Sequence, residues 1–236
     1  MLYISLSSRY VGVLVCSFPL LFLSVSQAQE GRHIADPLNI SNAYGFGFDA
    51  DTLKVGGRLG GENQSLAINS NFAGDKWALS YLYVSQPSAV TVSDSWNVSA
   101  SIDHGKTKTD EGSFSHYQYQ LGMIKEYKGW LNTSVYSELA ANFLDVDSIS
   151  NNDSLAVKWR LSVLKPWDPR WYNQFATEIT ASIDGSERYG GLANIAVGYR
   201  LTHQWSWELG YQYQVVRFNG LTREDTQWLL GMKSQF

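Results

Sequence analysis

The chain has 236 residues, of which 17% are charged and 14% aromatic, and its net charge is −4. Charged residues make up about 25% of ordinary soluble domains, so the charge content is low. The acidic balance, without a basic cluster, argues against a nucleic-acid partner. The length allows one barrel or at most two small domains, and the many Tyr, Trp, Gly and Ser residues favour strands and turns over helices.

The first 28 residues have the features of a secretory signal peptide. Arg9 is the one charged residue in this segment, residues 11–25 are almost wholly apolar, and small residues lead up to Ala28. This pattern predicts export and cleavage after Ala28. The apolar run is shorter than the roughly 20 residues of a membrane-spanning helix. Cys16 is the single cysteine of the chain, so the exported part should contain no disulfide.

Residues 29–41, which include Pro37, show no hydrophobic period and are interpreted as a flexible periplasmic lead-in. From residue 42 to residue 236, apolar side chains recur at every second position, which is the period of β-strands with two unlike faces. We count twelve strands, or ten if the first two stripes form one bent strand. No segment after the signal peptide has the period of a helix. The pattern predicts an all-β fold, a single antiparallel barrel.

Short turns and longer polar segments alternate along the barrel region. The predicted short turns are 125–128, 165–169 and 202–204, and the predicted polar loops are 103–112, 144–153, 184–191 and 217–225. Bacterial membrane barrels have short periplasmic turns, longer external loops and an even number of strands. Counted back from the C-terminus, the short turns fall on the periplasmic side.

The apolar face could point to lipid or to a dry core, because alternation alone does not distinguish them. Aromatic residues near strand ends favour lipid outside, since aromatic belts mark membrane interfaces. These residues are Trp130, Trp171, Tyr172, Trp205 and Trp207. The membrane assignment fails if Trp159, Leu161 and Val163 meet one another in a dry interior.

The opposite face is small or polar and carries charges whose sign alternates between neighbouring strands. These residues are Lys54, Arg58, Glu138, Lys158, Arg160, Glu178, Arg200, Glu208 and Lys233. Neighbouring strands lie about 4.8 Å apart, so such groups can pair laterally. One hypothesis is a structural ion-pair network in the lumen. The other hypothesis is a selectivity filter for a charged solute. The positive charges of Lys54 and Arg58 would make such a filter prefer anions.

The last strand, 226–236, ends the chain on an aromatic residue of the apolar face. Phe236, Met232, Leu230 and Trp228 share this face, with Ser234 between them. The segment resembles the terminal strand of Gram-negative outer-membrane β-barrels. The resemblance implies location in the cell outer membrane, contact with its lipid, and a recognition signal for the barrel-assembly machinery.

Enzyme chemistry has weak support in the sequence. His104 and His116 lie near the external rim, and Ser113 and Ser115 are close to His116, so a rim active site is the least favoured hypothesis. No spacing typical of a metal site is present, and no cofactor is implied.

In strand number and length the chain is similar to small monomeric porins for acidic oligosaccharides. We therefore expect a non-enzymatic, narrow porin-like channel for small polar or charged solutes. The alternative is a closed structural or adhesive barrel.

Overall fold

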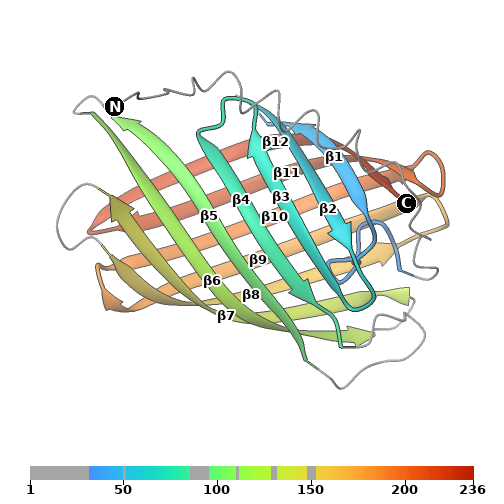
Figure 1. Cartoon of the computed structure of the whole chain (residues 1–236), viewed down its shortest axis with the longest axis horizontal. Coiled ribbons are helices and arrows are strands. Elements are labelled where there is room, and N and C mark those ends of the chain that lie inside the picture. Colours follow the sequence, from blue (N-terminus) through green and yellow to red (C-terminus); the bar gives the residue numbers. More distant parts are fainter. Residues whose placement is uncertain (1–31, 50–51, 86–95, 110–111, 129–131, 148–152) are drawn as a thin grey trace, which may run out of the picture.

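The structure is a computed structural model, and it describes residues 32–49, 52–85, 96–109, 112–128, 132–147 and 153–236. Twelve antiparallel strands form one closed barrel in which each strand pairs with its neighbours in sequence, and β1 pairs with β12 (Figure 1). The predicted fold class and strand number are confirmed, and the ten-strand alternative is wrong. In the described residues, no helix is long and apolar enough to cross a membrane.

The strands fall into two length classes. The first four strands contain six to eight residues each, whereas β5–β12 contain 13 to 17. The bounds are β1 Ala43–Phe48, β2 Leu53–Gly60, β3 Gln64–Asn71, β4 Lys76–Tyr83, β5 Asn97–Thr109, β6 Gly112–Lys128, β7 Ser134–Asp147, β8 Ser154–Pro166, β9 Trp171–Gly185, β10 Arg188–Arg200, β11 Trp205–Phe218 and β12 Leu221–Gln235. A membrane-crossing strand needs about 9–11 residues, so β5–β12 extend beyond the bilayer.

The barrel closes where the two ends of the chain meet. Ala43 lies opposite Gln235, and Phe48 lies opposite Leu230. The backbone N–H of Phe236 donates to the carbonyl oxygen of Asn42 at 3.0 Å. We call this end of the barrel periplasmic, because bacterial barrels have both termini in the periplasm.

Large apolar side chains point away from the barrel interior. On β9, Trp171, Phe175 and Ile179 are 43–54% exposed, whereas the intervening Tyr172 and Thr180 are buried. In water, leaving a large apolar side chain exposed costs about 1.5–3 kcal/mol relative to burial. An outward apolar band flanked by aromatics is the surface that a membrane barrel presents to lipid.

The outcome for the predicted aromatic belt is mixed. Trp159, which decides the membrane assignment, is 41% exposed, and Trp171 and Trp207 also face outward. The belt assignment of Tyr172 is wrong, because its ring is fully buried inside the barrel. Trp130 lies outside the described residues.

Most of the predicted external loops are strand. The segment 103–112 belongs mainly to β5 and β6, and β11 and β12 are joined by only Asn219 and Gly220. Both have positive φ, 48° and 82°, the conformation that tight two-residue hairpins need. Above the membrane a strand meets water on both faces, so its hydrophobic alternation disappears and the sequence resembles a loop.

Residues 32–41 are not a loose lead-in. Most of them are buried, and Leu38 and Ile40 are 0% and 1% exposed. Figure 1 shows this segment, in blue, within the outline of the barrel near the end that carries the C-terminus. Ala35, Leu38 and Ile40 form a small apolar cluster with inward side chains of β6–β9, including Tyr136 and Tyr172. The apolar core therefore lies at the periplasmic mouth.

Candidate functional site: the lumen and its plug

The charged residues predicted to line the lumen occupy inward-facing positions of their strands. The register places Arg160 of β8 directly opposite Glu138 of β7 and Glu178 of β9. The other members share this face: Lys54 and Arg58 on β2, Lys158 on β8, Arg200 on β10, Glu208 on β11 and Lys233 on β12.

Two pairs of these residues form ion pairs. Lys158 Nζ lies 3.5 Å from Glu178 Oε2, and Lys233 Nζ lies 2.8 Å from Glu208 Oε1. Glu208 also accepts a hydrogen bond from the hydroxyl of Tyr172 at 2.9 Å. Both pairs join adjacent strands, so they brace the wall.

Other predicted members make different contacts. Glu138 accepts hydrogen bonds from Ser99 Oγ at 2.7 Å and Gln120 Nε2 at 2.9 Å. Lys54 pairs with Asp49 at 2.6 Å, and Arg200 donates to the carbonyl oxygen of His203 at 3.3 Å.

Arg160 remains a free cation within the part of the chain that the structure describes. It is exposed and forms no ion pair with a described residue, although Glu138 and Glu178 flank it in register. It therefore adds positive potential to the lumen.

Arg188, which the sequence analysis placed in a polar loop, spans the lumen. Its Nη1 donates to Asn142 Oδ1 of β7 at 3.0 Å, and its Nη2 donates to Gln118 Oε1 of β6 at 2.7 Å. Arg188 belongs to β10, three and four strands away around the wall. At about 4.8 Å per strand, the wall path is too long for one side chain, so Arg188 crosses the interior. It therefore narrows the lumen at the level of Asn142 and Gln118.

Residues 32–42, which we call the plug, fold into two consecutive turns. The N–H of Asp36 donates to the carbonyl oxygen of His33 at 2.9 Å, and the N–H of Asn39 donates to that of Asp36 at 3.0 Å. Asp followed by Pro37 is favoured at the first two positions of such a turn. The Asp36 carboxylate also accepts from the N–H of Leu38 at 2.8 Å.

The plug contacts strands on all sides of the barrel. Gln174 of β9 donates to the carbonyl oxygen of Ala35 at 2.6 Å, and Asn39 Nδ2 donates to Gln235 of β12 at 2.9 Å. On β2, Arg58 donates to the Asn39 carbonyl oxygen. These strands are not neighbours around the wall, so the plug must lie across the lumen.

A buried charge cluster anchors the start of the plug. Arg32 Nη1 lies 2.9 Å from Asp36 Oδ2, and Arg32 Nη2 lies 3.1 Å from Glu126 Oε2 of β6. The three side chains are 3%, 4% and 6% exposed. Lys128 pairs with Glu126 from the same strand. Buried charges are tolerated only when they are paired in this way.

His33 begins the first turn of the plug and is partly buried. Its ring meets that of Tyr172 edge-on at 4.5 Å, and its Nδ1 accepts from the N–H of Ala35 at 3.2 Å. Burial and then the charge of Arg200 lower the pKa of His33 to about 4, with Glu208 opposing and Lys233 reinforcing that effect. His33 is therefore neutral in the docked plug at neutral pH.

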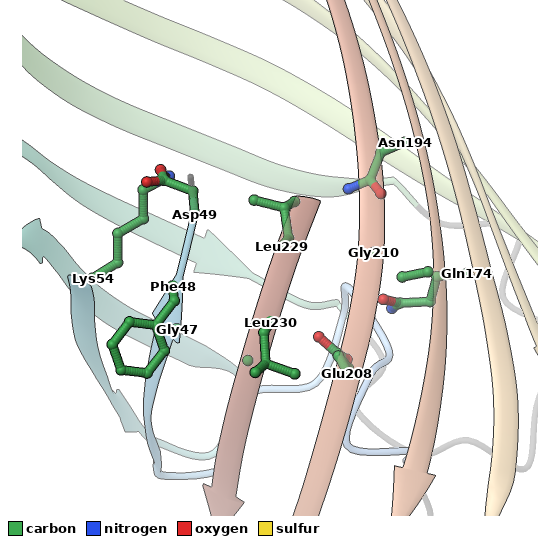
Figure 2. Close-up of a pocket in the computed structure, with 12 residues that line it drawn as sticks. Gly47, Phe48, Asp49, Lys54, Gln174, Asn194, Glu208, Gly210, Leu229 and Leu230 are labelled. Carbon is green, nitrogen blue, oxygen red and sulfur yellow. Dashed lines mark ion pairs between the residues drawn. The ribbon is translucent and has the colours of Figure 1, made fainter. Parts of the chain in front are cut away.

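A cavity of about 170 Å³ lies beside the plug, between β1–β2 and β9–β12. Figure 2 shows Lys54 and Asp49 on one side of it and Gln174, Asn194 and Glu208 on the other. Gly47, Gly210 and Gly231 leave the space between them, because they carry no side chains.

The predicted assembly residues lie on the outer face of β12. Trp228 is 64% and Leu230 42% exposed, Met232 is partly exposed, and the ring of Phe236 lies 5.2 Å from that of Tyr44. Their role in assembly stays a prediction.

The rim histidines are not gathered into one site. His104 packs against the outward rings of Trp77 and Tyr117, whereas His116 lies against Gly105 on the lumen face. The described residues contain no group of three or more His, Cys, Asp or Glu side chains that could hold a metal ion.

No protein-family model and no curated protein sequence matches the chain. Among solved structures, the barrel is similar to the NanC porin, with a TM-score of 0.50 and 10% identity over 83% of this chain and 100% of that one. It also resembles the KdgM porin, with a TM-score of 0.47 and 10% identity over 84% and 99%. A third match is the translocator domain of the autotransporter NalP from Neisseria meningitidis, with a TM-score of 0.48 and 13% identity over 83% and 86%.

At 10% identity, the likeness to the NanC porin concerns the fold alone. The chain has the fold of an outer-membrane β-barrel.

Proposed function

We propose that the chain is a narrow porin-like channel that carries small polar or charged solutes across the outer membrane. The supporting observation is a lumen lined by charged and amide side chains, with a cavity beside them. A barrel that served only as a scaffold could fill this space with apolar side chains. The role is proposed to be non-catalytic, because His104 and His116 lie on opposite faces of the wall.

The lumen charges favour anionic solutes. Arg160 and Arg188 form no ion pair with a carboxylate among the described residues, whereas Glu178 and Glu208 are paired with lysines and Glu138 accepts hydrogen bonds from Ser99 and Gln120 without an ion pair. Unpaired cations inside a low-dielectric wall raise the local concentration of anions. The NanC porin has a similar fold, and we extend the role of a porin to this chain as part of the proposal.

The test is ion conductance of the purified full barrel in planar bilayers with a KCl gradient. We expect discrete conductance steps and a reversal potential on the anion side. Arg160→Ala should move that potential toward cations. Arg217→Ala is the matched control, since Arg217 is exposed on β11 and pairs in register with outward-facing Tyr189.

The second candidate is a closed structural barrel, which the plug and the Arg188 crossing favour. In that case, Arg160→Ala would alter heat stability and no condition would give conductance. Absence of conductance in every variant, including variants with the plug displaced, contradicts the channel.

A further inference from the structure

We infer that the plug, residues 32–42, is a displaceable closure of the periplasmic mouth, latched by the buried charges of Arg32, Asp36 and Glu126. The inference rests on the proposed channel function, because a closure matters only in a barrel that conducts. The experiment below separates the failure of one from the failure of the other.

The position of the plug is that of an obstruction. Its contacts reach β2, β6, β9 and β12, which are distributed around the whole wall. Leu38 and Ile40 fill the space between the inward side chains of Tyr136, Leu164 and Tyr172. A solute that enters from the periplasmic mouth therefore meets the plug backbone.

Most polar contacts of the plug are hydrogen bonds that water can replace. The plug contributes no strand to the barrel, since β1 begins at Ala43. Apart from the small apolar cluster and the Arg32–Glu126 ion pair, it is held by hydrogen bonds, such as those of Gln174 and Asn39 and the backbone bond between Phe236 and Asn42. Water replaces such bonds at a modest net cost. Undocking needs a pivot just before Ala43 and leaves all strand pairing intact.

The charge cluster is buried from water together with the apolar residues of the plug. Removing Arg32 would leave the buried Asp36 carboxylate without an ion-pair partner among the described residues, whereas Glu126 would keep only Lys128. An uncompensated buried charge is strongly unfavourable. Undocking would hydrate both carboxylates, so the loss of Arg32 should raise the undocked fraction by about a hundredfold.

A second perturbation acts by shape instead of charge. A Cβ atom on Gly60 would lie 1.8 Å from the carbonyl oxygen of Ile40, so Gly60→Ala requires the plug backbone to move. Gly57, on the same strand, is the matched control. Its Cβ would meet only the Ala43 carbonyl oxygen, at an ordinary 3.8 Å.

The first readout is thiol labelling, which needs no conductance. Cys16 is replaced by Ser or removed with the signal peptide, and Leu38→Cys is introduced at a fully buried plug position. We expect slow reaction with a membrane-impermeant maleimide in the otherwise unchanged barrel. Arg32→Ala or Gly60→Ala should accelerate the reaction at least about tenfold, and Gly57→Ala should not. Pro37→Cys, at an exposed position of the same segment, should react quickly in every background.

The second readout is bilayer conductance of the same variants, with the folded barrel verified by its heat-modifiable mobility in gels. Faster labelling with raised conductance in Arg32→Ala and Gly60→Ala supports both proposals. Faster labelling without conductance in any variant overturns the proposed channel function. The plug would then be displaceable, but its displacement would open no conducting path. Full conductance of the unmodified barrel, with unchanged labelling in the variants, overturns the closure and leaves the channel standing.

Discussion

Replacing Gly198 by Ala should destabilise the barrel, because the missing side chain leaves room for Tyr172. A Cβ atom on Gly198 would lie 2.0 Å from Cζ of the Tyr172 ring and 2.4 Å from its hydroxyl oxygen. Ordinary carbon contacts are about 3.5–4.0 Å, so the ring would have to move by roughly 1.5 Å. Tyr172 is fully buried, donates to Glu208 and packs on His33, so it has no free direction to move.

The magnitude follows from two losses. Overpacking a well-packed site costs about 1–3 kcal/mol. A hydrogen bond to a charged group contributes about 1.5–3 kcal/mol, and the displaced Tyr172 hydroxyl would lose the one to Glu208. We therefore expect Gly198→Ala to lower the free energy of unfolding by about 3–5 kcal/mol. Gly190→Ala is the control on the same strand and face, because its Cβ would meet Thr180 Cβ at an ordinary 3.6 Å.

The assay is urea unfolding of the barrel in lipid vesicles, followed by tryptophan fluorescence. A double-mutant cycle with Tyr172→Leu isolates the clash, since the alanine penalty should largely vanish once the ring is gone. The reasoning is refuted if Gly198→Ala and Gly190→Ala differ by less than about 0.5 kcal/mol.

Three further predictions concern the lumen and the terminus. Arg188→Ala should increase single-channel conductance about twofold or more, because it removes the side chain that crosses to Asn142, and the bilayer recording measures this. Acidification should release the plug. The pKa of His33 is about 4 in the docked plug, whereas an exposed histidine has an ordinary pKa of about 6.5. The docked state is therefore fully favoured above pH 6.5 and loses roughly 3 kcal/mol of stability as the pH falls to 4. Labelling of a cysteine at position 38 should therefore accelerate across this window. Phe236→Ala should slow barrel assembly in cells, measured as a several-fold lower folded fraction in gels, while the purified barrel loses the ring contact with Tyr44.

Each of these has a matched control. Arg217→Ala should leave conductance unchanged, since Arg217 lies outside the lumen. His33→Gln should abolish the pH response of labelling, and a response that persists in this variant shows that another group titrates. Tyr44→Ala removes the same ring contact as Phe236→Ala but keeps the terminal aromatic, so equal assembly defects in the two variants contradict a terminal signal.

The inward position of the charges could be predicted, but their partners could not. Side chains of a strand alternate between two faces, so parity placed Glu178 and Glu208 opposite the apolar face, and the aromatic residues near strand ends indicated that the apolar face meets lipid. Whether Arg160 pairs with Glu138 depends on side-chain paths across the lumen and on competing donors such as Ser99. The side-chain pairs in the lumen join residues tens of positions apart in the sequence, so no local sequence pattern predicts them.

The plug was missed for a related reason. Its signals are present in the sequence, as an Asp36-Pro37 turn and as Ile34, Leu38 and Ile40 in a segment interpreted as a lead-in. A segment without the hydrophobic period of a strand or helix nevertheless resembles a linker when its sequence is considered alone. Its order comes from Glu126, 94 positions away from Arg32, and from Gln235, 196 positions away from Asn39.

The sequence alone determined an antiparallel barrel of about twelve strands with one apolar and one polar face, because side-chain facing in a strand repeats every two residues and needs no knowledge of distant contacts. Tertiary structure alone decided what occupies the lumen. Closing the barrel brings residues from opposite walls within reach of Arg188 and of the plug, and only that closure supplies the partners that make their buried charges tolerable.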